Sequence, residues 1–255
     1  MSDKISANKY AVPALERAHA VLLELSEHRG GMRLTDLSRR LGVNKSSMFC
    51  LLKTMESLGW VEKSSDDVYT LGSALAAFGS SFFRGQALID RFYRTAVETR
   101  DRLGETIQLA RLEGADVFYL AKLEAPFPVQ IASEPGMRFP AHATGLGKAL
   151  LATLADDEVR KRLSDPLPRL TPATIGTVTE LLDELADVRR QGVAFDREEA
   201  VIGFRCAAAP VFGPDGRAVA AVSVSMPRHH WEQKRDAAVR EIRALARRLS
   251  VNANV

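Results

Sequence analysis

The periodicity of the chain changes at Gly59, and this change restricts the fold of the first seventy residues more than any other feature of the sequence. Before it, three amphipathic stretches carry apolar residues at helical spacing, and each one ends at glycine. After it, two short strand-like runs flank a polar turn. We therefore predict three short helices followed by a β-hairpin. The helices span Pro13 to about residue 29, Leu34–Leu41 and 44–58, and the strands span Trp60–Lys63 and Val68–Leu71.

Local signals support the second and third of these helices. Thr35 and Asn44 are the expected N-caps, because short polar side chains accept hydrogen bonds from the free N–H groups of a first turn. One stripe of the third helix is apolar and should be buried. It comprises Met48, Leu51, Leu52, Met55 and Leu58. The opposite face should be free, and it carries Ser46, Phe49, Cys50, Lys53 and Ser57, with Lys45 and Ser47 beside it.

Two helices joined by a tight turn and followed by a hairpin are typical of a winged helix-turn-helix, whose second helix enters the DNA major groove. The interval between Asp36 and Glu56 contains four cations and no acid. Phe49-Cys50 supply no arginine for guanine, although Phe49 can contact a thymine methyl group. Asp66-Asp67 in the wing disfavour a phosphate contact by Lys63. The candidate DNA-binding residues are Arg39, Arg40, Lys45, Ser46, Ser47, Phe49 and Lys53. The alternative is a three-helix module that only contacts proteins.

The overall charge does not reveal this surface. The net charge of +3 divides into +1 for residues 1–72 (10 basic, 9 acidic), −2 for 73–227 (18 basic, 20 acidic) and +4 for 228–255 (7 basic, 3 acidic). No apolar run approaches the roughly 20 residues that cross a bilayer. The two cysteines, Cys50 and Cys206, form neither a disulfide framework nor a paired-cysteine metal site. We expect a soluble, cytoplasmic protein without membrane contact.

Residues 73–103 read as a mostly helical connector with an apolar stripe. A protein that binds two-fold symmetric operators is normally a dimer, so we expect this helix to pack against the same helix of a second copy. The alternative is that it packs on its own domain.

From Gly104 onward, strand and helix signals mix, so the fold class is α+β. The predicted strands are Thr106–Leu112, Val117–Leu123, Val129–Ala132, Val193–Phe195, Cys206–Phe212 and Ala218–Ser225. The predicted helices are Leu146–Leu154, Asp156–Leu163, Val178–Arg190 and Trp231–Leu249.

The familiar enzyme motifs fail on inspection. The run at 145–149 resembles a phosphate loop, but His142 stands where glycine is required and Ala149 follows the lysine. A dinucleotide fingerprint fails because position 150 is leucine. We expect no enzyme, catalytic residue, cofactor or metal. The enzymatic alternative is a hydrolase with Cys206 as nucleophile, His142 as base and Asp196 as orienting group.

The motifs, taken together, resemble the IclR family of bacterial transcription regulators. The resemblance extends from Val12 to Pro227, and the late signature is its most specific part. The matching segments are Val12–Leu25, Lys45-Ser46-Ser47, Tyr69–Gly72, Pro140–Leu151 and Gly192–Phe212, the last with Gly192, Asp196, Glu199, Cys206, Ala208, Val211 and Phe212 at the family's spacing. Gly213 departs from the family, which has Asp or Asn there.

The resemblance implies three parts: a winged helix-turn-helix domain in 1–72, a dimerising connector in 73–103 and a GAF-like effector-binding domain in 104–255. It implies dimers that can pair into tetramers, a double-stranded operator and a small effector such as an organic or aromatic acid. It implies polar pocket contacts from Gly145, Leu146, Asp196, Cys206, Ser223 and Ser225, and apolar walls from Pro128, Ile131, Phe139 and Phe204. Repression or activation depends on where the operator lies. A metabolite sensor that acts only through protein contacts is another alternative.

The residues themselves agree with much of this pocket. Ser223 and Ser225 lie two apart on a strand and share one face; the alternative is that they bond each other or the backbone. Gly145 and Leu146 open a predicted helix, whose free N–H groups favour a carboxylate. Asp196 would repel an acid, so it binds a ligand hydroxyl or pairs with a neighbouring arginine, Arg197 or Arg205.

Overall fold

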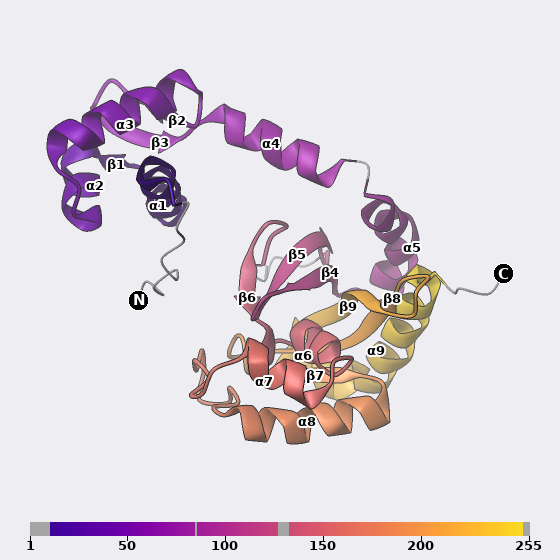
Figure 1. Cartoon of the computed structure of the whole chain (residues 1–255). Coiled ribbons are helices and arrows are strands. Elements are labelled where there is room, and N and C mark those ends of the chain that lie inside the picture. Colours follow the sequence, from indigo (N-terminus) through magenta and orange to yellow (C-terminus); the bar gives the residue numbers. More distant parts are fainter. Residues whose placement is uncertain (1–10, 85, 127–132, 252–255) are drawn as a thin grey trace. The chain divides into compact units, whose positions relative to one another are not determined.

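The computed structural model describes residues 11–84, 86–126 and 133–251, which form two compact units that divide between residues 84 and 85. The N-terminal unit contains α1 (Pro13–Glu27), α2 (Leu34–Leu41), α3 (Lys45–Ser57) and α4 (Ser73–Phe83), with three short strands (Figure 1). The strands β1 (Met32–Arg33), β2 (Val61–Lys63) and β3 (Val68–Leu71) form an antiparallel sheet in the order β1-β3-β2.

The predicted helices and hairpin are confirmed, with small corrections. Asn44 caps α3, since its Oδ1 accepts a hydrogen bond from the Ser47 amide at 2.8 Å. Thr35 is not a cap: α2 begins at Leu34 directly after β1, so Thr35 lies inside the helix. Leu58 is 52% exposed because α3 ends before it. The sequence missed β1, since a two-residue strand is too short to show a periodicity.

A core of α1, α2, α3 and the sheet fixes the direction of α3. Val21, Leu37, Met48, Leu52 and Tyr69 are buried together. Gly42 adopts the left-handed conformation (φ +64°) that ends α2 and turns the chain into α3.

The C-terminal unit is built on a six-stranded antiparallel sheet in the order β6-β5-β4-β9-β8-β7. Its elements are α5 (Ala87–Leu103), β4 (Thr106–Glu113), β5 (Asp116–Leu123), β6 (Arg138–Pro140), a 3₁₀ turn (Ala141–Ala143), α6 (Gly145–Leu151), α7 (Asp156–Arg162), α8 (Val178–Gln191), β7 (Ala194–Arg197), β8 (Phe204–Phe212), β9 (Ala218–Pro227) and α9 (Arg228–Leu249). The α+β fold class is thus confirmed. The predicted strand Val129–Ala132 lies outside the described residues, and β6 was not predicted.

Helices cover both faces of this sheet (Figure 1). Successive residues of β8 point to opposite faces: Cys206 lies against Gly145 of α6, and Arg205 bonds Glu232 of α9. The sheet with α6 and α8 therefore encloses one core, whereas α5 and α9 pack on the other face.

The predicted connector is two helices. α5 buries Ile89, Phe92 and Ala96 against the C-terminal unit, so the alternative that it packs on its own domain holds for this half. α4 buries no residue in the described chain, although it contains no charge. The two units divide between residues 84 and 85, within the segment 73–103 that the sequence sets apart as a connector.

Candidate functional site

The exposed face of α3 is the one that the sequence predicts. Met48, Leu52 and Met55 point into the core, and Phe49 on the other side is 48% exposed. Ser46, Cys50, Lys53 and Ser57 are also exposed. This leaves a polar helical surface with one aromatic side chain free for a partner.

The cations around α3 are less free than their sequence interval suggests. Arg39 pairs with Asp36 at 2.6 Å, Arg40 with Glu24 at 2.8 Å, and Lys53 with Glu56 at 2.9 Å. In the wing, Lys63 pairs with Asp67 at 2.5 Å. The folded chain brings acids from outside the interval onto its cations. Lys45 forms no ion pair with any described residue and is the cation most available to a phosphate.

A cavity of about 210 Å³ lies in the C-terminal unit beside the start of α6. Eight of the ten predicted pocket residues line it: Phe139, Gly145, Leu146, Asp196, Phe204, Cys206, Ser223 and Ser225. The other two, Pro128 and Ile131, lie outside the described residues. The tertiary structure thus brings together residues that are up to 86 positions apart in the chain.

Other lining residues were not anticipated from the sequence. Gln108 of β4 accepts a hydrogen bond from Ser225 Oγ at 3.0 Å and donates from its side-chain nitrogen to Ser133 Oγ. Tyr119 of β5 stacks edge-on against Phe139, with ring centroids 5.8 Å apart, and forms an aromatic wall. No local pattern signals these residues, because only the sheet register brings β4 beside β9 and β5 beside β4.

The two serines of β9 differ in their partners. Ser225 donates its hydroxyl to Gln108, so for this residue the alternative of a bond to Ser223 or to the backbone is wrong. Ser223 is fully buried, and its Oγ has no hydrogen-bond partner among the described residues. An unpaired hydroxyl in an apolar setting costs free energy, so a group that forms a hydrogen bond with it is favoured in this cavity.

Asp196 is buried in the cavity wall. Its Oδ1 accepts the Glu199 amide at 2.7 Å, yet burial, assisted by the nearby Glu199 charge, raises its pKa to about 7. Of the two alternatives for Asp196, pairing with a neighbouring arginine is wrong. Arg197 pairs with Glu184, and Arg205 pairs with Glu198 and Glu232.

A buried ion pair supports this wall from behind. Lys148 of α6 is fully buried, and its Nζ lies 2.6 Å from Glu199 and 3.3 Å from Glu184. Glu199 also donates its amide to Asp196, so the lysine of the sequence run 145–149 serves to hold the turn after β7 against α6.

The three residues of the hydrolase alternative do not form a catalytic triad. Burial raises the pKa of the Cys206 thiol far above neutrality, which disfavours a thiolate. His142 does not line the cavity; its Nε2 lies 2.9 Å from the Pro168 carbonyl, and burial lowers its pKa. Within the described residues there is no His, Cys, Asp and Glu cluster suited to a metal ion. No described helix has the length and apolar character to cross a membrane.

Comparison with known proteins covers both units. Residues 14–65 match the model of the IclR helix-turn-helix domain, and residues 84–251 match that of the bacterial transcriptional regulator IclR C-terminal domain. The HTH-type transcriptional regulator XynR of Escherichia coli K12 is 32% identical over 84% of this chain and 86% of its own length. The transcriptional repressor IclR of the same strain is 30% identical over 85% of this chain and 80% of its own length.

Solved structures agree. An IclR homolog from Microbacterium hydrocarbonoxydans in complex with 4-hydroxybenzoate superimposes with a TM-score of 0.79 at 25% identity, over 93% of this chain and 97% of the other. The IclR regulator from Alicyclobacillus acidocaldarius gives a TM-score of 0.81 at 27% identity, over 94% and 98% of the two chains. The chain belongs to the IclR family of bacterial transcriptional regulators, with a DNA-binding helix-turn-helix domain and a C-terminal effector-binding domain.

Proposed function

We propose that a small organic or aromatic acid binds in the 210 Å³ cavity and shifts the affinity of this regulator for a double-stranded operator. The observation that carries the proposal is Ser223, a fully buried hydroxyl without a partner in a cavity that the signature residues Asp196 and Cys206 also line. A ligand oxygen at this point satisfies the hydroxyl and recovers the free energy that its burial costs.

The size and walls of the cavity support a small, flat ligand. Pockets for drug-sized ligands are roughly 300–1,000 Å³, so this one suits a smaller metabolite. Tyr119, Phe139 and Phe204 provide aromatic surface, and the relative from Microbacterium hydrocarbonoxydans was crystallised with the aromatic acid 4-hydroxybenzoate. Asp196 restricts the pose: when ionised it accepts from a ligand hydroxyl, and when protonated it donates to a carboxylate.

The operator contacts belong to the first turns of α3. Lys45, Ser46, Ser47 and Phe49 stand at the N-terminal end of the helix, where recognition helices meet bases and phosphates. Arg39, Arg40 and Lys53 contribute when phosphates displace the carboxylates that they bind in the free protein. Surface ion pairs of this kind are worth about 0–1 kcal/mol, so a phosphate competes readily.

The experiment is a titration of the purified protein into a fluorescent DNA fragment from upstream of its own gene, with and without small carboxylic acids. We expect one or more acids to change the affinity and also to raise the melting temperature, because a ligand selective for the folded state stabilises it. An acid that raises the melting temperature of wild type but equally that of Ser223→Ala contradicts the assigned pocket. Failure of the wild type to bind this DNA at low salt contradicts the proposal that the protein binds an operator there.

A further inference from the structure

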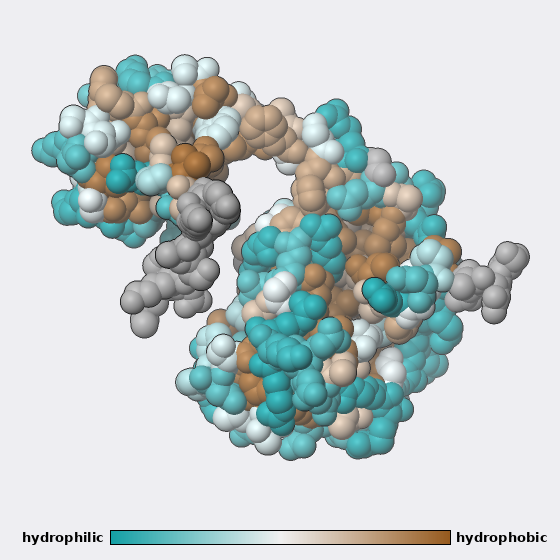
Figure 2. Space-filling model, viewed as in Figure 1, coloured by the Kyte–Doolittle hydropathy of each residue, from teal (hydrophilic) through white to brown (hydrophobic). Residues whose placement is uncertain are grey.

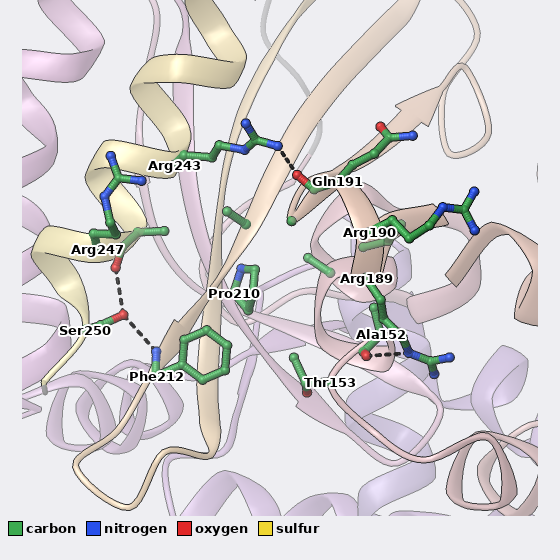
Figure 3. A pocket seen from close by; sticks show the side chains of 15 residues that line it. Ala152, Thr153, Arg189, Arg190, Gln191, Pro210, Phe212, Arg243, Arg247 and Ser250 are labelled. Carbon is green, nitrogen blue, oxygen red and sulfur yellow. Dashed lines mark hydrogen bonds between the residues drawn. The ribbon is translucent and has the colours of Figure 1, made fainter. Parts of the chain in front are cut away.

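A second hollow, of about 760 Å³, lies in the C-terminal unit between the end of α8, the end of α9 and the free end of β8 (Figure 3). We call it the arginine cleft, after the four side chains at its rim: Arg189, Arg190, Arg243 and Arg247. Among the described residues, it shares no lining residue with the cavity around Ser223, and none of those that line it is acidic. It is therefore a surface separate from that cavity, and it is rich in arginine.

The two arginines from α8 are already held by carboxylates. Arg189 pairs with Asp156 at 2.8 Å and also donates to the Ala152 carbonyl at 2.9 Å. Arg190 pairs with Asp187. These two side chains shape the cleft without adding much net charge.

The two arginines from α9 have no acidic partner among the described residues. Arg243 donates to the carbonyl of Gln191, which is neutral, and Arg247 is exposed with no ion pair in the part of the chain that the structure describes (Figure 3). Glu241, the nearby acid of α9, is bound by Arg102 at 2.8 Å. Like charges four residues apart on one helix repel each other, so the pair favours an anion between or above them. The two arginines are part of the net charge of +4 in residues 228–255, to which no role in operator binding is assigned.

The floor of the cleft is apolar and does not accept an added strand. β7 pairs with β8 only as far as Ala208, so Pro210 lies beyond it, and proline has no N–H to donate. At Phe212 the backbone is occupied, since its amide donates to Ser250 Oγ and its carbonyl accepts from Val251, both at 2.9 Å. A partner must therefore be recognised by side chains, with the 37% exposed ring of Phe212 among the apolar contacts.

We propose that the arginine cleft docks a short acidic segment of another protein, which places carboxylates on Arg243 and Arg247 and an apolar side chain against Pro210 and Phe212. The two arginines without an acidic partner favour a partner segment that carries carboxylates. Arginine and aromatic residues beside an apolar floor are the composition of interface centres. A free anion would satisfy the guanidinium groups but leave this floor exposed.

The test is a selection of short random peptides displayed on phage against the immobilised full-length protein. The Kd of each enriched peptide is then measured by fluorescence anisotropy. We expect enriched peptides to be acidic with a large apolar residue. Their Kd should rise about tenfold or more in Arg247→Glu and stay within about twofold in Arg240→Glu. Arg240 is a matched control, because it is an exposed arginine of the same helix outside the cleft.

Phe212→Ser tests the floor and should weaken binding by a similar factor, with thermal melting as the check on folding. The proposal is overturned if no peptide is enriched or if Arg247→Glu binds the enriched peptides as wild type does. It also fails if peptides with serine in place of their apolar residues bind equally well, which would indicate an adventitious anion only. A change in sedimentation of Arg247→Glu without peptide binding would instead assign the cleft to contacts between copies of this chain.

Discussion

Ser223 and Ser225 lie two residues apart on β9 and face the same cavity, yet their hydroxyls have opposite energetic roles. Ser225 donates to Gln108, whereas Ser223 Oγ is buried without a partner. We expect Ser223→Ala to raise the free energy of unfolding of the unliganded protein by up to about 1 kcal/mol, and Ser225→Ala to lower it by about 1–2 kcal/mol, since it orphans Gln108 Oε1. Urea unfolding measures both. Equal destabilisation by the two changes would show that Ser223 has a partner.

Asp196 makes stability depend on pH. Its pKa is raised to about 7 in the folded protein, against about 3.9 in an unfolded chain. Between these values the folded state binds more protons, so the free energy of unfolding falls as pH rises from about 4 to about 7 and changes no further above that through this group. Asp196→Asn should flatten this fall, as seen by urea unfolding at about pH 5 and about pH 8. A variant with the wild-type pH dependence would contradict it.

At the scale of elements, the ion pairs around α3 rank its cations. Lys45 is unpaired among the described residues, and Lys53 is held by Glu56. We expect Lys45→Gln to weaken operator binding and to reduce the slope of log K against log salt by about 0.9, the value for one phosphate contact. Lys53→Gln should act in the same direction but less. Lys161→Gln, a change to an exposed lysine of α7, is the control and should leave the slope unaltered.

At the scale of the whole molecule, α4 is a helix that the described part of a single chain leaves uncovered. α4 carries no charge and buries no residue among those described, and its surface is largely apolar (Figure 2). Phe78 is 60% exposed. We expect a dimer in which α4 is covered by a second copy. Phe78→Asp should shift the sedimentation profile toward monomer and weaken operator binding, since two half-sites are no longer engaged together. Leu170→Asp, at a 44% exposed apolar residue elsewhere, should leave the profile unchanged. A wild type that sediments as a monomer at all concentrations would contradict this.

Local pattern was enough for much of the fold. Helical spacing, glycine stops and the Asn44 cap predict α3 and its exposed face, because these signals act within a few residues. The failures are equally local. Thr35 resembled a cap, but β1 preceded α2 without a loop. The pair of Arg40 with Glu24 escaped a count of charges along the chain, since that carboxylate reaches the cation only after folding, whereas Arg39 and Lys53 pair with acids three residues away on their own helices.

The sequence by itself determined the winged helix-turn-helix, the α+β class and, through its family signature, most of the residues that line the cavity. Only the tertiary structure decided the environments of those residues. Sheet register places Gln108 directly opposite Ser223, yet the Gln108 side chain bonds the diagonal Ser225 and leaves Ser223 Oγ without a partner among the described residues. Burial raises the pKa of Asp196, and the end of α9 brings Arg243 and Arg247, which have no acidic partner among the described residues, to one cleft. Partner, solvation and charge balance depend on contacts between distant segments, which no local periodicity encodes.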